Sequence, residues 1–333
     1  MNKINKIIQK AKLSDFSIFP KWSIRKMVFV AILIAISVAF TTVSSQIIPW
    51  VNISSYKFAF IGLPVKITGF IFGPLIGFLV GFISDLISLL FVPPVGYSPI
   101  YSLATAINGL VSGIFGMYFM QFINNAFSVT FRINNINLKI HKLASKLRIA
   151  ESKEDTKAEV KYAQKIITLN NKKTFISENG SDRLLANIYL INGVLFISIV
   201  ISFIFIYVGY LTKDEWISNG IVKNRWALVA LMTAGMGAMI IFIVVARFKM
   251  SLKKYKIFVP IIVFSSFLEL INIPLLSIGD LYTLGNGDLS NIYTWISQHI
   301  LISPIKIWFN VFVIYYSYLV VAKLINKNAN LSY

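Results

Sequence analysis

The chain contains no cysteine, which excludes disulfides, thiolate metal ligands and thiol nucleophiles. It has only two histidines, His141 and His299, and this argues against a histidine-rich metal site. No glycine-rich loop ends in Gly-Lys-Ser/Thr, so no ATPase site is evident, and the common zinc-protease and serine-hydrolase motifs are also missing. We therefore expect no metal, no cofactor and no catalytic residue in this chain.

Charged residues are scarce as well. They make up 14% of the 333 residues, whereas soluble domains carry about a quarter. Hydrophobic residues reach 56%, and they are gathered into long runs. A helix needs about 20 such residues to cross the roughly 30 Å of hydrocarbon in a bilayer. We therefore predict an all-α integral membrane protein with about eight spans, which lie at 27–48, 56–72, 74–92, 100–122, 186–211, 226–246, 257–278 and 295–325.

Two segments differ from the rest in being rich in charge. Residues 1–26 form a basic tail with seven Lys or Arg, and no small-residue signal cleavage site follows the first apolar run. Residues 124–185 carry twelve basic and six acidic residues, and their stretch 139–169 is typical of a solvated helix or helix pair. The charged segment separates the fourth predicted span from the fifth.

The net charge of +19 is explained by topology rather than by nucleic-acid binding. If the N-terminus is cytoplasmic, 26 of the 32 Lys and Arg lie inside and only four lie outside. Membrane proteins concentrate Lys and Arg on cytoplasmic loops in this way. We therefore predict a plasma-membrane protein with both termini and residues 124–185 in the cytoplasm, in contact with the lipid bilayer and not with nucleic acid.

Ionisable side chains inside the predicted spans are the first candidates for a functional site. Each costs at least about 2.5–3.5 kcal/mol at the centre of a span, so such residues are usually functional. Four of them lie about 10–17 Å below the outer face at the helical rise of 1.5 Å per residue, and His299 lies nearer the edge. The four are Lys66, Asp85, Glu269 and Lys306.

Two polar stripes reinforce this candidate site. His299, Ser303, Lys306 and Asn310 are spaced by 4, 3 and 4 residues, which places them on one helical face. Ser265, Glu269 and Asn272 form a similar stripe on the preceding span. We interpret the stripes as the wall of a water-filled cup that opens outward. In the alternative interpretation, Lys66 and Lys306 form structural ion pairs with Asp85 and Glu269, and both interpretations can hold together.

Small residues recur every fourth position on two other spans. Gly73, Gly77 and Gly81 lead to Asp85 on the same face, and we expect them to pack inside the molecule, because such faces let helix backbones approach closely. Ala31, Ala35 and Ala39 form the second stripe. Spacing alone leaves open whether these alanines pack internally or against another protein.

Several stretches resemble the S component of an energy-coupling factor (ECF) vitamin transporter, closest to the folate-type family. They are Ala31–Ser37, Leu63–Pro64 with Gly69–Gly77, Gly81–Ile87, Gly96–Pro99 with Ser102–Gly113, and Ile302–Ile307. Together the similar regions cover residues 27–122 and 255–325, about half of the chain.

The resemblance implies a six-helix core at 27–122 and 255–325. An insertion at 123–254 then contributes a cytoplasmic segment, 124–185, and an extra transmembrane hairpin, 186–246, and residues 326–333 form a short cytoplasmic tail. It further implies high-affinity binding of a vitamin, a transmembrane coupling subunit that docks on Ala31, Ala35 and Ala39, and two cytoplasmic ATPases. The loop at 93–99, with Tyr97, would cover the site.

The chain departs from the folate-type pattern at two positions. Thr42 and Trp295 stand where folate-type members resemble one another in having basic residues. Lys66 and Lys306 could supply these charges to an anionic vitamin, so we predict a site for folate or a related anion at Lys66, Asp85, Glu269, His299, Ser303, Lys306 and Tyr97. Pantothenate-, pyridoxine- and riboflavin-type subunits share the architecture, and an intramembrane enzyme or a membrane scaffold are the remaining alternatives.

Overall fold

The computed structural model describes residues 24–47, 54–91 and 98–329, and every regular element within them is a helix. Four helices come first: α2 (Ile24–Ile47), α3 (Ser54–Phe72), α4 (Pro74–Phe91) and α5 (Pro99–Gly116), which continues through the π-helical η2 (Met117–Ile123) into α6 (Asn124–Ala126). The charged segment forms α7 (Val129–Glu151) and α8 (Thr156–Asn179). After it come α9 (Asp182–Ile206), η3 (Tyr207–Leu211), α10 (Asp214–Ser218), α11 (Arg225–Lys249), α12 (Leu252–Leu284), η4 (Leu289–Asn291) and α13 (Ile292–Ala329).

Six of these helical segments are long and apolar enough to cross a membrane, which confirms an all-α membrane protein. They are α4, α5 with its extension to Ala126, α9 with η3, α11, α12, and η4 with α13 to Val321. The other two predicted spans include α2 and α3, whose described stretches Met27–Val43 and Gly62–Phe72 are also apolar but are shorter than 18 residues.

Glycines bring α3, α4 and α5 into backbone contact. A Cβ atom added at Gly77 would overlap the carbonyl group of Gly109, and one at Gly81 would lie 2.5 Å from the carbonyl oxygen of Thr105. Gly73 serves a different purpose, since its φ of +98° lets the chain turn from α3 into α4. The predicted internal packing thus holds for Gly77 and Gly81, which bring α4 against α5. Gly69 brings α3, the helix of Lys66, against the same Gly109 backbone.

Gly77→Ala should therefore destabilise the protein. The added methyl group meets backbone rather than a flexible side chain, and overpacking of this kind costs about 1–3 kcal/mol or more. We expect a clearly lower melting temperature for the purified variant in detergent. Gly237→Ala is the matched control, because a Cβ at this helical glycine has no neighbour within 4 Å among the described residues. Equal melting temperatures for the two variants would contradict the close crossing.

Helix α2 buries one face and leaves the other open. Val30, Leu33 and Ser37 are buried toward α3 and α4. The alanine stripe of Ala31, Ala35 and Ala39 is exposed, and it is flanked by exposed apolar side chains such as Ile32 and Ile36. The alanines therefore take no part in the packing of the described chain, and their face is available to lipid or to another protein.

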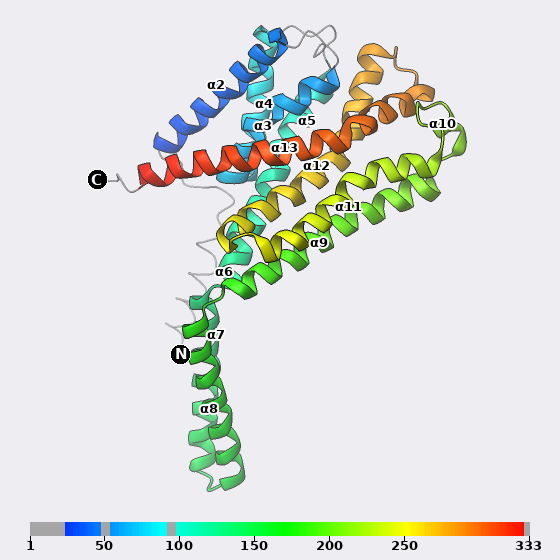
Figure 1. The fold of residues 1–333 in the computed structure, drawn as a ribbon. Coiled ribbons are helices and arrows are strands. Elements are labelled where there is room, and N and C mark those ends of the chain that lie inside the picture. Colours follow the sequence, from blue (N-terminus) through cyan, green and yellow to red (C-terminus); the bar gives the residue numbers. More distant parts are fainter. Residues whose placement is uncertain (1–23, 48–53, 92–97, 330–333) are drawn as a thin grey trace.

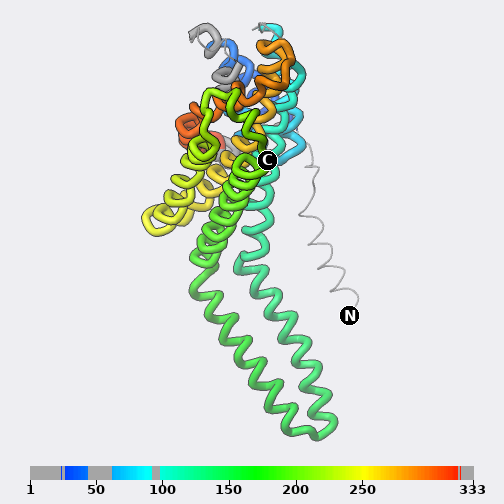
Figure 2. Tube along the Cα trace, turned by 90° about the vertical axis from the view of Figure 1, so that its right-hand side faces the viewer, coloured from blue at the N-terminus to red at the C-terminus, as the bar shows by residue number. Residues whose placement is uncertain are grey.

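The charged segment folds into an antiparallel hairpin of α7 and α8, which confirms the prediction of a helix pair. The hairpin projects from one end of the bundle (Figure 1), and the side view shows the same projection (Figure 2). Apolar residues of α7 recur at alternating intervals of four and three, the spacing of a coiled-coil contact line: Val129, Ile133, Ile136, Ile140, Leu143, Leu147 and Ala150. Packing against α8 along this line accounts for a stable helix pair outside the bundle.

The extra hairpin of α9 and α11 packs along α12 and α13. Gly193 of α9 lies against Val259 of α12, and Gly235 of α11 lies against Pro304 of α13. These small residues let the hairpin lie close to the two helices that carry Glu269 and Lys306. The α9–α11 hairpin therefore packs against the helices that carry two of the pocket's charged side chains.

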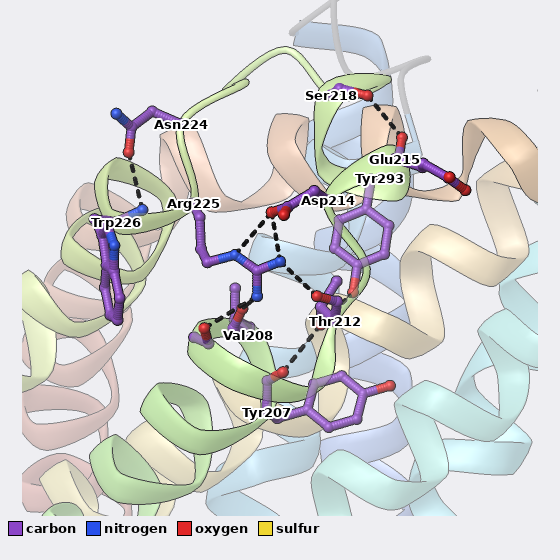
Figure 3. A network of polar contacts seen from close by, with 11 residues as sticks. Tyr207, Val208, Thr212, Asp214, Glu215, Ser218, Asn224, Arg225, Trp226 and Tyr293 are labelled. Carbon is purple, nitrogen blue, oxygen red and sulfur yellow. Dashed lines mark hydrogen bonds and ion pairs between the residues drawn. The ribbon is translucent and has the colours of Figure 1, made fainter.

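A network of polar contacts around Arg225 and Thr212, here called the clasp, links the loop of this hairpin to α13 (Figure 3). The Arg225 guanidinium donates to the carbonyl oxygens of Val208 (2.9 Å), Gly209 (3.0 Å) and Thr212 (2.6 Å), which satisfies carbonyls left open at the end of η3. It also forms an ion pair of 2.6 Å with Asp214. The Thr212 hydroxyl lies 3.0 Å from that of Tyr293 on α13, so the loop and α13 are held together.

Candidate functional site

The candidate site is a pocket between three helices. Lys66 comes from α3, Ser265, Glu269 and Asn272 from α12, and Lys306 and Asn310 from α13, with apolar walls made by Leu268, Leu276 and Ile307. The intervals of four and three residues on α12, and of four on α13, place these polar side chains on one face of each helix, as predicted. In this state the pocket is narrow and has room for water rather than for a vitamin, so side chains or helices must move apart for a larger ligand to enter.

One ion pair crosses the pocket wall. Lys306 Nζ lies 2.9 Å from Glu269 Oε1, and the two side chains are 12% and 6% exposed. This is one of the two ion pairs that the alternative interpretation of the sequence requires. The second is not formed, because Asp85 accepts a hydrogen bond of 2.5 Å from the Ser102 hydroxyl and does not line this pocket.

Lys66 is the unpaired cation of the pocket. Its side chain is 5% exposed, and within the described part of the chain it makes no ion pair or hydrogen bond. A Cβ atom added at Gly62 would lie 3.7 Å from Lys66 Nζ and 3.3 Å from Asn108 Nδ2, so both polar groups lie beside Gly62. A buried ammonium without an anion is costly in a membrane protein, and such residues commonly mark a binding site.

Three buried oxygen atoms of the pocket are unpaired as well. The Ser265 hydroxyl and the side-chain carbonyl oxygens of Asn272 and Asn310 have no hydrogen-bond partner in the described structure. Asn272 is held in place by α5, since its Nδ2 donates to Asn108 Oδ1 at 2.7 Å. Because nearly all buried polar groups in proteins are hydrogen-bonded, this group of exceptions indicates a ligand or water that completes the site.

A second polar cluster lies on the same two helices, α12 and α13, near the α12–α13 connection. Asp280 is 1% exposed, accepts a 2.5 Å hydrogen bond from the Tyr101 hydroxyl and lies 3.0 Å from His299 Nε2. The predicted span ended at residue 278, so Asp280 was missed, whereas α12 continues to Leu284. One signal was present: Asp280 follows Glu269 by 11 residues, three helical turns, and so shares its face.

The predicted site residues therefore divide into groups. One pocket brings together Lys66, Glu269 and Lys306. His299 instead contacts Asp280 in the second polar cluster. Asp85 binds Ser102, and Ser303 is buried without lining the pocket. Tyr97 lies outside the described residues. The pocket residues Asn272, Ser265 and Asn310 were predicted only as members of polar stripes, and their unpaired oxygens could not be foreseen from spacing.

The Lys306–Glu269 pair gives a direct stability test. Lys306→Met should lower the ligand-free stability by about 3 kcal/mol, because it leaves a buried carboxylate without its cation. Adding Glu269→Gln should restore most of this loss by removing the stranded charge. Thermal unfolding of the purified variants without ligand measures both effects. If the double variant melts as low as Lys306→Met, the ion pair is not the cause of the loss.

Comparison with known proteins identifies one related family. Residues 21–140, about a third of the chain, match the family described as ECF-type riboflavin transporter, S component. No curated protein and no solved structure matches the chain. The match supports an S component of an ECF transporter, a family of transport subunits and not of enzymes, and it does not confirm the closer resemblance to folate-type members.

Proposed function

We propose that this chain is the substrate-binding subunit of an ATP-driven ECF vitamin importer, with folate or a related anionic vitamin as its ligand. The observation that carries the proposal is the buried pocket with an unpaired ammonium, Lys66, and three unpaired oxygens inside a helical membrane domain. The family match over residues 21–140 supports the same function. Pantothenate, pyridoxine and riboflavin remain alternative ligands.

The energy for transport would come from partner subunits. The chain carries no phosphate-binding loop, so ATP hydrolysis falls to two cytoplasmic ATPases that act through a transmembrane coupling subunit. The exposed face of Ala31, Ala35 and Ala39 on α2 is the proposed docking surface. Small residues let a partner helix approach the backbone closely, and these alanines are not used for packing within the described chain.

An intramembrane enzyme is the weaker alternative. Asp85 and Glu269, the carboxylates that an enzyme would most plausibly use, lie in different surroundings, one bonded to Ser102 and the other paired with Lys306. Paired carboxylates for acid and base catalysis are therefore not brought together by these two residues.

Reconstitution tests the proposed function. The purified chain alone should bind a vitamin tightly and release it unchanged, and ATP-dependent uptake into proteoliposomes should require the coupling subunit and both ATPases. Mass spectrometry of the released small molecule distinguishes unchanged ligand from product. Chemical conversion of a lipid or vitamin by the chain alone would reject the transport function, as would uptake that does not depend on the ATPases.

The proposed orientation places both termini and the α7–α8 hairpin in the cytoplasm. Because the chain has no native cysteine, single cysteines at positions 160 and 218 can be labelled without background. We expect a membrane-impermeant maleimide to label position 218 in intact cells and to label position 160 only after the membrane is opened. Labelling of position 160 from outside would overturn the orientation.

A further inference from the structure

The pocket carries a net charge of +1. Two lysines, Lys66 and Lys306, and one glutamate, Glu269, are its charged lining residues in the described structure. Lys306 and Glu269 neutralise each other at 2.9 Å, which leaves the Lys66 ammonium as the excess charge. A ligand with a single negative charge would balance the pocket, whereas a dianion would leave one charge buried without compensation.

The unpaired oxygens of the pocket indicate which groups the ligand must carry next to its negative charge. Ser265 Oγ, Asn272 Oδ1 and Asn310 Oδ1 are all buried acceptors that line the pocket. The two amide oxygens can only accept hydrogen bonds, so the ligand must offer O–H or N–H donors to them. Since they belong to α12 and α13, the donors must lie close to the anionic group that meets Lys66.

The apolar part of the lining is aliphatic. Leu268, Leu276 and Ile307 provide it, and the pocket's described lining includes no aromatic side chain. Sites for flat heteroaromatic rings usually supply an aromatic face, because stacking contributes about 1–3 kcal/mol per ring when a base is bound.

We infer that the ligand is a small aliphatic monoanion that carries O–H or N–H groups next to its anionic group. Among the anionic vitamins of the proposed importer, the pocket thus favours such a molecule over folate, which has an extended flat ring. This inference rests on the proposed function, since it names the substrate class of the same pocket. Each part of such a ligand has a partner in the pocket. The ammonium of α3 would bind its anionic group, and the three unpaired oxygens of α12 and α13 would accept from its donors. The aliphatic wall would pack against its remaining carbon atoms.

Direct binding to the purified full-length chain in nanodiscs tests the inference with four probes. Pantothenate is an aliphatic monoanion with hydroxyl and amide donors, and panthenol is its neutral alcohol analogue. Riboflavin and folate represent flat rings, the latter with two carboxylates. We expect pantothenate to bind at least about tenfold more tightly than panthenol, which lacks the contact with Lys66. We expect riboflavin and folate to bind at least tenfold more weakly than pantothenate.

A variant links the selectivity to Lys66. In Lys66→Met, the preference for pantothenate over panthenol should fall to near unity, while in Lys223→Met, at an exposed lysine on the outer loop, it should stay unchanged. Tighter binding of riboflavin or folate than of pantothenate would overturn the inference and leave the proposed function standing. Equal binding of pantothenate and panthenol would also overturn it, and absence of binding by all four probes would count against both proposals.

Discussion

Lys66→Met should weaken the binding of an anionic vitamin by at least about tenfold, and by more than a hundredfold if the site is fully dry. A charge-assisted hydrogen bond between a buried ammonium and a carboxylate contributes about 1.5–3 kcal/mol. Each 1.4 kcal/mol is a factor of ten in the dissociation constant. Because Lys66 has no protein partner in the described structure, the whole of this contribution belongs to the ligand.

The stability of the same variant separates binding from folding. Methionine fills a similar volume without the cost of a buried charge, so the ligand-free melting temperature of Lys66→Met should stay the same or rise. Lys306→Met should also lose at least tenfold in affinity but should melt lower, because Glu269 is stranded. Calorimetric affinity and ligand-free melting temperature are the two measurements, with Lys223→Met as the control. Unchanged affinity in both pocket variants would refute the site.

Ala31→Leu combined with Ala35→Leu should abolish transport while leaving vitamin binding intact. The two side chains lie on the exposed face of α2, away from the pocket, so the fold and the ligand site should tolerate the change. Two added isobutyl groups would hold a partner helix away from the α2 backbone and remove the close contact that small residues allow. We expect uptake at background level and loss of co-purification with the coupling subunit.

A matched control exists on another spanning helix. Ala234 and Ala238 of α11 are also exposed and four residues apart, so Ala234→Leu with Ala238→Leu adds the same bulk to a different face. This control should transport normally. If the α2 variant still co-purifies with its partner at the yield of the unchanged chain, the alanine face is not the docking surface.

The sequence was sufficient to locate most of the long apolar helices. Runs of apolar residues placed α4, α5, α9, α11, α12 and α13 to within a few residues, because the bilayer imposes length and composition on a spanning helix. For α2 and α3 the described apolar stretches are Met27–Val43 and Gly62–Phe72, so at these two helices the prediction of a full span stays a prediction.

The sequence could not predict which side chains pair with one another across helices. Residue spacing gives the face of a helix, but the rotation and register of one helix against another decide whether Lys306 meets Glu269 or Asp85. The close glycine contacts between α3, α4 and α5 fix part of that register. The same reason explains why the spacing of Ala31 and Ala35 could not tell an internal face from an external one.

The contacts of the 207–225 loop with α13 couple the position of this loop to the position of a helix that lines the pocket. The Thr294 hydroxyl of α13 donates to the Asn219 carbonyl at 2.7 Å, and the Tyr293 hydroxyl lies 3.0 Å from that of Thr212. We therefore expect the loop to move together with α13. Lys306 and Asn310 lie on that same helix. A spin label at position 218, read against a second label on α4, would therefore record the opening of the pocket as a change in distance, without any probe near the ligand.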